Sequence, residues 1–166
     1  MYRLARRAAG LAAVLAIAVA GVAVAAKGGA GTETTTEHLH EIVLLEKMGT
    51  PNPCTGEEGT LLATASNAMM HITTHADGDL WATFNAEGTV TFTPVSPEGT
   101  AYSGHFHLWG GESLNNKNEV QHETGTFVLH AANGSKVTVH TVGHISTNGK
   151  GEPTVEFHTE EVHCGG

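Results

Sequence analysis

The stretch 126–141, TFVLHAANGSKVTVHT, decides the fold class. On both sides of Asn133-Gly134, hydrophobic and polar residues alternate with a period of two, which is the period of a β-strand with one buried face. The Asn-Gly pair supplies the positive φ angles that a tight hairpin turn requires. The stretch therefore predicts two antiparallel strands joined by a short turn.

The same alternation recurs along most of the chain, and no segment shows the spacing of an amphipathic helix. Turn signals such as Asp77-Gly78, Glu87-Gly88, Pro97-Glu98-Gly99 and Asn148-Gly149 separate the alternating segments. We expect strands at about 38–48, 59–76, 79–87, 88–94, 100–110, 119–132, 135–147 and 153–163. The pattern predicts an all-β, single-domain antiparallel β-barrel of about eight strands, because closing a sheet removes its exposed edges.

Each predicted strand has a more hydrophobic face, which we expect to point into the barrel. In 100–110 and 135–147 this face carries Tyr102, Gly104, Phe106, Leu108, Val137, Val139, Thr141, Gly143 and Ile145. In 153–163 it carries Val155, Phe157 and Thr159, and the opposite face carries Glu156, His158 and Glu160.

The first residues have the composition of a secretory signal peptide. Arg3, Arg6 and Arg7 precede an Ala/Val/Leu-rich run that ends at Ala26, so we expect a signal peptide over 1–26 and a secreted, extracellular protein. An uncleaved transmembrane anchor is the alternative. Residues 27–37 are small and polar and predict a flexible leader, which leaves 38–166 as the barrel domain.

The chain contains two cysteines, Cys54 and Cys164. In an exported protein they predict one disulfide, which would stabilise the fold by about 4 kcal/mol because it closes a long loop. Two free thiols that act as metal ligands or as a nucleophile are the alternative.

The charge balance excludes some partners. After residue 26 the chain has no arginine and five lysines against 17 acidic residues, which gives a formal charge of −12. Nucleic acids and anionic membrane surfaces both require clustered Lys and Arg, so we expect neither as a partner.

Twelve histidines follow the predicted signal peptide, and many lie an even number of residues apart, so that both members of a pair share one strand face. We consider His105, His107, Glu112, His140 and His144 as candidate ligands of Zn²⁺ or Cu²⁺. The alternative is that these histidines form a solvated polar face of the sheet.

Two resemblances follow from the same region. Gly99, His105, His107 and Glu112 have the spacing of the first metal-binding motif of the cupin family, which implies a His/His/Glu site, although Glu119 stands where that motif has a glycine. Tyr102, Gly104, Phe106 and Trp109-Gly110-Gly111 resemble a Tyr-x-Gly-x-Phe-x-x-Trp-Gly-Gly pattern of small secreted actinobacterial proteins, which implies secretion and no particular chemistry.

The sequence contains neither the Gly-x-Ser-x-Gly motif of serine hydrolases nor a phosphate-binding glycine loop. We therefore expect a secreted, non-catalytic β-barrel that binds a small apolar ligand. A metal-binding protein or metal-dependent enzyme is the second hypothesis, and a structural or cell-surface interaction protein is the third.

Overall fold

The computed structural model describes residues 31–115 and 118–166, which form one antiparallel sheet of eight strands. The strands are β1 (Glu33–Leu39), β2 (Ile42–Pro51), β3 (Glu58–Thr74), β4 (Leu80–Pro94), β5 (Tyr102–Asn115), β6 (Asn118–His130), β7 (Lys136–Thr147) and β8 (Pro153–Gly165). These ranges contain no helix, and hence none that could cross a membrane. The predicted signal peptide, 1–26, lies outside the described residues.

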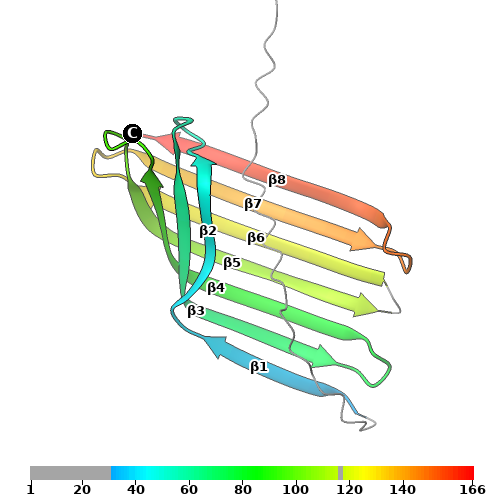
Figure 1. Ribbon diagram of the computed structural model, residues 1–166. Coiled ribbons are helices and arrows are strands. Elements are labelled where there is room, and N and C mark those ends of the chain that lie inside the picture. Colours follow the sequence, from blue (N-terminus) through cyan, green and yellow to red (C-terminus); the bar gives the residue numbers. More distant parts are fainter. Residues whose placement is uncertain (1–30, 116–117) are drawn as a thin grey trace, which may run out of the picture.

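Strands β3 to β8 follow one another across the sheet, each hydrogen-bonded to the next (Figure 1). Both β1 and β2 pair with β3: Leu39 of β1 lies opposite Ala68, and Ile42 of β2 lies opposite Ala65. The chain changes direction between them at Glu41, whose φ is 53°. One edge of the sheet is therefore shared by β1 and β2, and the other edge is β8.

The all-β class and the eight antiparallel strands are confirmed, but the predicted closed barrel is not. Closure would require β8 to pair with β1 or β2, and within 31–115 and 118–166 it pairs only with β7. At the opposite edge, β1 and β2 together pair along β3, and no described strand links either of them to β8.

Three predicted boundaries differ from the structure. Predicted strands 79–87 and 88–94 are one strand, β4, and the predicted turn at Glu87-Gly88 is wrong. Predicted strand 38–48 is divided between β1 and β2, and β1 begins at Glu33, within the predicted leader. Gly88 lies opposite Ala65, beside a bulge in β3, and a Cβ at this glycine would collide with the carbonyl oxygen of Thr64. The glycine therefore permits a close approach of two strands and does not mark a turn.

Three hairpins share one type of turn. In the β6–β7 hairpin, the Ala131 N–H donates to the Ser135 carbonyl (2.9 Å), and the Gly134 N–H donates to the Ala131 carbonyl (3.0 Å). The positive φ falls on Gly134 alone (89°), as expected for a type I turn that is followed by a left-handed residue. Segments 75–79 and 148–152 repeat this pattern, with Gly78 and Gly151 in the left-handed position.

The sheet bends across its middle. Figure 1 shows β2 and the adjoining ends of β3 and β4 rising out of the plane of the other strands and curving toward the C-terminal end of β8. The bend follows the bulge at Ser66, where the β3–β4 register shifts, and continues through Gly88 and Gly104. At Gly104 a Cβ would collide with the carbonyl oxygen of Val128. We call the curved part of the sheet, which includes β2 and the adjoining ends of β3 and β4, the closed half. We call the flatter part, which includes β1, the open half.

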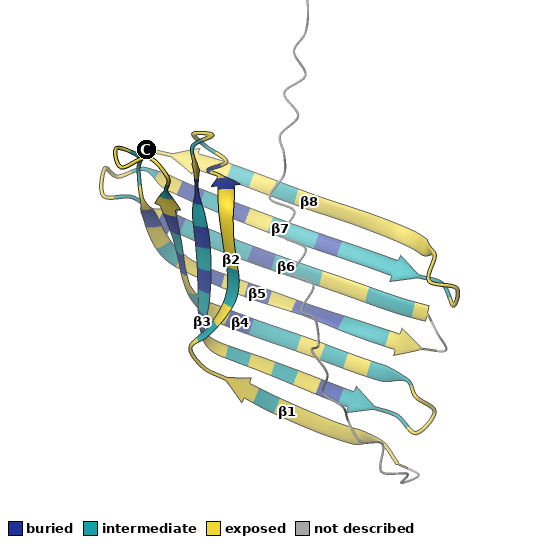
Figure 2. Cartoon of the chain, in the orientation of Figure 1, coloured by how far each residue is buried: buried dark blue, intermediate teal, exposed yellow. Residues whose placement is uncertain are grey.

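The core lies on the concave side of the closed half, which we call the inner face. Phe106 (1% exposed) and Val90 (0%) are its most completely buried large residues, and the ring of Phe106 stacks on that of Phe127 with centroids 5.9 Å apart. The predicted inward set Tyr102, Phe106 and Leu108 is buried there. Figure 2 shows the buried positions concentrated in the closed half, with exposed positions dominating β1 and β8.

The predicted disulfide between Cys54 and Cys164 is present, with a Cα–Cα distance of 5.8 Å. It joins the turn between β2 and β3 to the end of β8, which are 110 residues apart in the chain. The two edges of the sheet are thus joined covalently at the closed half, where hydrogen bonds would join them in a barrel.

Candidate functional site

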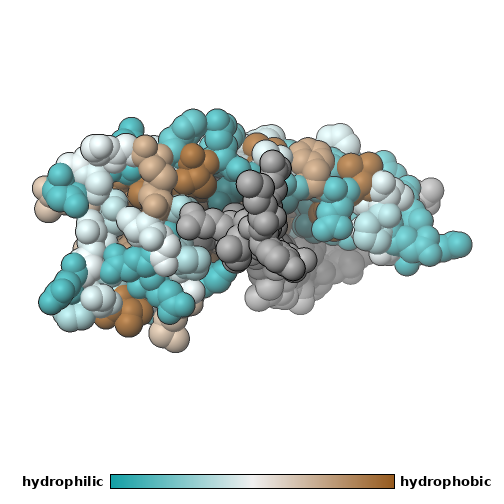
Figure 3. All heavy atoms as spheres, turned by 90° about the horizontal axis from the view of Figure 1, so that it is seen from above, coloured by the Kyte–Doolittle hydropathy of each residue, from teal (hydrophilic) through white to brown (hydrophobic). Residues whose placement is uncertain are grey.

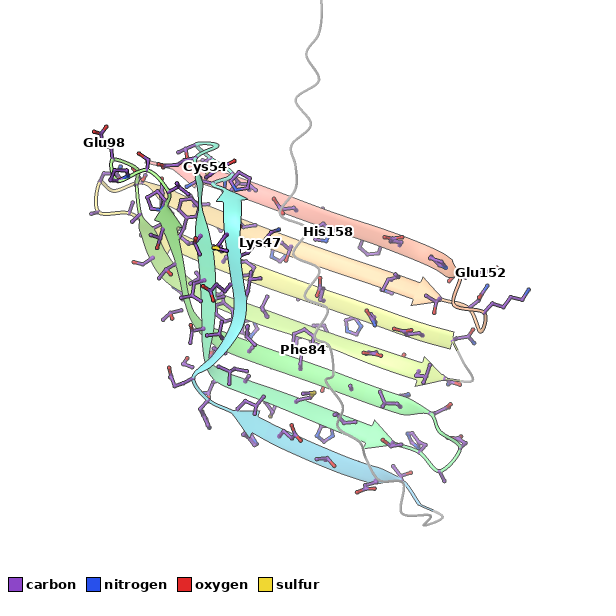
Figure 4. The ribbon with its side chains drawn as sticks, in the orientation of Figure 1. Lys47, Cys54, Phe84, Glu98, Glu152 and His158 are labelled. Carbon is purple, nitrogen blue, oxygen red and sulfur yellow. A yellow bond between two sulfur atoms is a disulfide. The ribbon has the colours of Figure 1, made fainter. Side chains whose placement is uncertain are left out.

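The inner face of the closed half contains a cavity of about 70 Å³. Its walls come from seven of the strands, β2 to β8, and are mostly hydrophobic, with Leu45, Leu61, Phe84, Phe92, Phe127 and Val139 among the lining residues. Figure 4 labels two residues of this lining, Phe84 on β4 and His158 on β8, and also Cys54 in the turn above the closed half. A concave, apolar pocket of this kind is the usual form of a small-molecule site.

One end of the cavity is closed by the turn that carries the disulfide. Pro51, Asn52 and Pro53 line the cavity, and Asn52 is only 3% exposed. The Oδ1 atom of Asn52 accepts hydrogen bonds from the backbone N–H groups of Cys54 (2.9 Å) and Thr55 (3.2 Å), which satisfies this buried side-chain oxygen and fixes the turn. Cys54 then holds the turn against β8. This end of the cavity is therefore rigid and covalently tied.

The lining also includes a polar group on β6 and β8, formed by Glu123, His158 and Glu160. The sequence assigned the two β8 residues to the outside of the sheet, and this prediction is wrong. Glu160 lies opposite Thr141 and His158 lies opposite Gly143, so both share the inner face with the hydrophobic residues of β7. Val155 and Phe157, predicted to point inward, are 48% and 49% exposed on the other face.

The Glu123 side chain lies over Gly143. A Cβ at Gly143 would be 3.0 Å from both Cγ and Oε1 of Glu123, so the glycine leaves the space that this carboxylate occupies. Gly143 separates Glu123 from His158 in the cross-strand register, since it pairs with both residues. Burial raises the pKa of Glu123, and the positive charge of His158, when protonated, lowers it in part. The carboxylate is therefore held in a partly dehydrated position where its charge is only partly compensated.

Glu160 is the second carboxylate of this group. Its Oε2 atom is buried and has no hydrogen-bond partner among the residues that the structure describes. Further along the inner face, burial also raises the pKa of Glu112, and the nearby charge of Glu119 raises it further. No lysine or arginine of the described residues lines the cavity. The one ion pair of the described part, His163 Nε2 to Glu161 Oε1 (3.0 Å), joins two exposed side chains elsewhere on β8.

The predicted metal ligands lie on both faces of the sheet. His105, His107, His140 and His144 occupy the outer face of β5 and β7, where His107 is two positions from Trp109. Glu112 is an odd number of residues from His105 and His107 along β5, and it therefore lies on the inner face. The three residues with cupin-like spacing thus project from opposite sides of the sheet.

The outer-face histidines contact hydroxyl groups and aromatic rings. Nδ1 of His140 lies 3.1 Å from Oγ1 of Thr126, and the His144 ring stacks on Phe157 with centroids 5.4 Å apart. The His122 ring lies against Trp109 at 4.9 Å, and His122 is the cross-strand partner of His144. The outer face of β5 to β8 therefore carries an indole ring, two neighbouring imidazole rings and a phenyl ring in succession.

Within 31–115 and 118–166, no group of three or more His, Cys, Asp or Glu side chains is placed to hold a metal ion. Metal binding by the strand histidines stays a prediction. Comparison with known proteins finds no matching family model and no similar curated protein or solved structure. The site must therefore be interpreted from its own chemistry.

Proposed function

We propose that this protein is a secreted, non-catalytic binding protein that holds a small apolar ligand in the cavity of the closed half. The observation that carries the proposal is the cavity itself, whose walls are hydrophobic over nearly their whole extent. Preformed concave sites with a few convergent polar groups are the common form of ligand sites.

The size of the cavity limits the ligand. An apolar cavity of about 150 Å³ is enough to hold a benzene molecule, and this cavity measures about 70 Å³. The enclosed space therefore accepts a short alkyl chain or part of a ring. A longer ligand would extend over the inner face of the open half, where Phe84, Leu80 and Met70 are only partly buried.

Extracellular location is part of the proposal. A disulfide that joins the two edges of the sheet is compatible with an oxidising compartment. The arginines and the hydrophobic run of the first 26 residues support export.

The proposal is tested by titrating the chain with the neutral apolar dye N-phenylnaphthylamine, whose fluorescence rises in a dry site. The edge of one ring would enter the cavity, and the rest of the dye would lie over the inner face of the open half. Val139 is 7% exposed and lines the cavity, so Val139→Phe fills the space, and we expect the fluorescence increase to be lost. Val142→Phe is the matched control, because Val142 lies on the outer face of the same strand. Equal dye binding by both variants, or no binding by the unmodified chain, would contradict the proposal.

A further inference from the structure

We infer that the ligand is a small organic cation, with its hydrophobic part in the cavity and its ammonium group between the carboxylates of Glu123 and Glu160. This inference rests on the proposed function and specifies the chemical class of the ligand. Figure 4 shows His158 on β8, the strand that carries Glu160, on the same side of the sheet as Phe84.

The first argument is charge complementarity. Two carboxylates and one histidine, but no lysine or arginine among the described residues, line a cavity whose walls are mostly hydrophobic. The lysines in the part of the chain that the structure describes are Lys47, Lys136 and Lys150, and none of them lines the cavity. Charges removed from water are costly unless an opposite charge or hydrogen-bond donors compensate them. Among the described residues of the lining, only His158 can compensate these charges, and it does so in part for Glu123; a cationic ligand supplies the remainder.

The second argument is the unpartnered oxygen. Oε2 of Glu160 is buried without a hydrogen-bond partner, although native proteins satisfy most buried polar atoms. Glu160 lines the cavity, so a ligand there can approach the carboxylate. An N–H donor, or the polarised methyl groups of a quaternary ammonium, would remove the cost of leaving this oxygen unpaired.

The third argument is the placement of Glu123. Its side chain lies over Gly143, toward β8, instead of extending away from the sheet into solvent. The raised pKa of Glu123 shows that this position opposes the charged form, with burial as the main cause. A ligand cation would reverse that effect, because an opposite charge within a few ångströms favours the ionised carboxylate.

Charge also distinguishes this ligand from its alternatives. A fatty acid or other organic anion would place its head group beside two carboxylates, and the nearest basic group is the exposed His158. A neutral apolar molecule would leave the Glu160 oxygen unpaired. Of the three classes, the cation alone satisfies both the hydrophobic walls and the carboxylates.

The experiment compares three probes that share one hydrophobic chain: octyltrimethylammonium, octanol and octanoate. Each is titrated into the chain by calorimetry at neutral pH and low ionic strength. We expect the ammonium to bind at least about tenfold more tightly than the alcohol, since only the ammonium brings a charge opposite to that of the two carboxylates. Octanoate should bind least tightly.

The variant Glu123→Gln/Glu160→Gln should reduce the affinity for octyltrimethylammonium to that for octanol, with octanol binding unchanged. Unchanged octanol binding also shows that the variant folds. The matched control, Glu87→Gln/Glu161→Gln, removes two exposed carboxylates from the outer face and should preserve the preference for the cation.

The outcomes separate this inference from the proposed function. Equal affinity for ammonium and alcohol, or tighter binding of octanoate, would overturn the inference and leave the apolar site in place. A preference for the cation that survives Glu123→Gln/Glu160→Gln would also overturn it, because the charge would then act elsewhere. Absence of binding by all three probes would overturn both.

Discussion

Strands β3 to β8 run through both the closed half and the open half, yet the two halves differ in what their inner faces contain. In the closed half, the inner face is hydrophobic and buried, with Val90 and Phe106 almost fully covered. In the open half, the inner face of the same strands carries Glu112 on β5 and Glu156 on β8 beside hydrophobic residues, and much of it remains exposed.

The difference shows that the alternation of hydrophobic and polar residues decides the face of each side chain, whereas the curvature of the sheet decides which of these side chains are buried. Alternation assigns each side chain to a face, but only the bend at Gly88 and Gly104 brings opposite parts of one face together. Viewed from above, the surface in Figure 3 is a mixture of hydrophobic and hydrophilic residues. The buried core lies in the curved half, where the disulfide joins the two edges of the sheet.

The largest expected effect comes from removing the disulfide. The variant Cys54→Ser/Cys164→Ser should lose about 4 kcal/mol of unfolding free energy, because the bond closes a very long loop. Urea denaturation measures the loss, and dye binding in the cavity should fall with it, since the turn at Asn52 is no longer tied to β8. A variant with unchanged stability and dye binding would show that strand packing alone closes this end.

The next effect contrasts two phenylalanines. Phe106→Ala removes a ring that is 1% exposed in the closed half, and we expect a loss of about 3–5 kcal/mol. Phe157→Ala removes a ring that is 49% exposed on the outer face, and we expect a loss of about 1 kcal/mol or less. Denaturation of both variants measures the difference. Similar losses would contradict the assignment of Phe157 to the outer face.

A smaller effect is expected at the bend. Gly104→Ala places a Cβ against the carbonyl oxygen of Val128, which the strand can avoid only by moving away from its neighbour, at a cost of about 1–3 kcal/mol. Gly165→Ala is the control, because its nearest contact would be Lys136 Cβ at 3.9 Å, an ordinary van der Waals distance. If Gly104→Ala were as stable as the control, the close approach at the bend would be refuted.

The smallest effect concerns the acidic part of the inner face. Burial raises the pKa of Glu112, so the folded state binds its proton more readily than the unfolded state does. The ionised Glu112 carboxylate therefore lowers the free energy of unfolding. This destabilisation is fully present above the pKa of Glu112 in the folded state, and it disappears as the pH falls below the pKa of Glu112 in the unfolded state. Glu112→Gln should raise the melting temperature at pH 7, with a benefit that shrinks on acidification.

The exposed outer-face carboxylate of Glu87 provides the control for that measurement. Glu87→Gln removes the same charge without relieving a buried carboxylate. A Glu112→Gln benefit that grows at acidic pH, or that Glu87→Gln reproduces, would show that burial of Glu112 is not its cause.

Much of the fold is predictable from local pattern, and most of the site is not. The alternation and the Asn133-Gly134 signal predict antiparallel strands correctly, because turn chemistry and the two-residue period are local properties. Glu87-Gly88 has the same local form as a turn, and only the approach of β3 shows that it belongs to a strand. The sequence pattern did not place the β8 carboxylate beside the cavity. Val155 and Phe157 are more hydrophobic than Glu156, His158 and Glu160, so the pattern predicted that Val155 and Phe157 face inward. The face of an edge strand is fixed by its register with the neighbouring strand, and an edge leaves room for polar groups to reach water.

The most direct test of the account is an amide NMR titration of the isotope-labelled chain with octanol. The account predicts that shift changes cluster on cavity residues from several strands, such as Leu61, Phe127 and Val139, and weaken toward β1. Shift changes centred on the outer-face row of Trp109, His122 and Phe157, with the cavity residues unaffected, would contradict it.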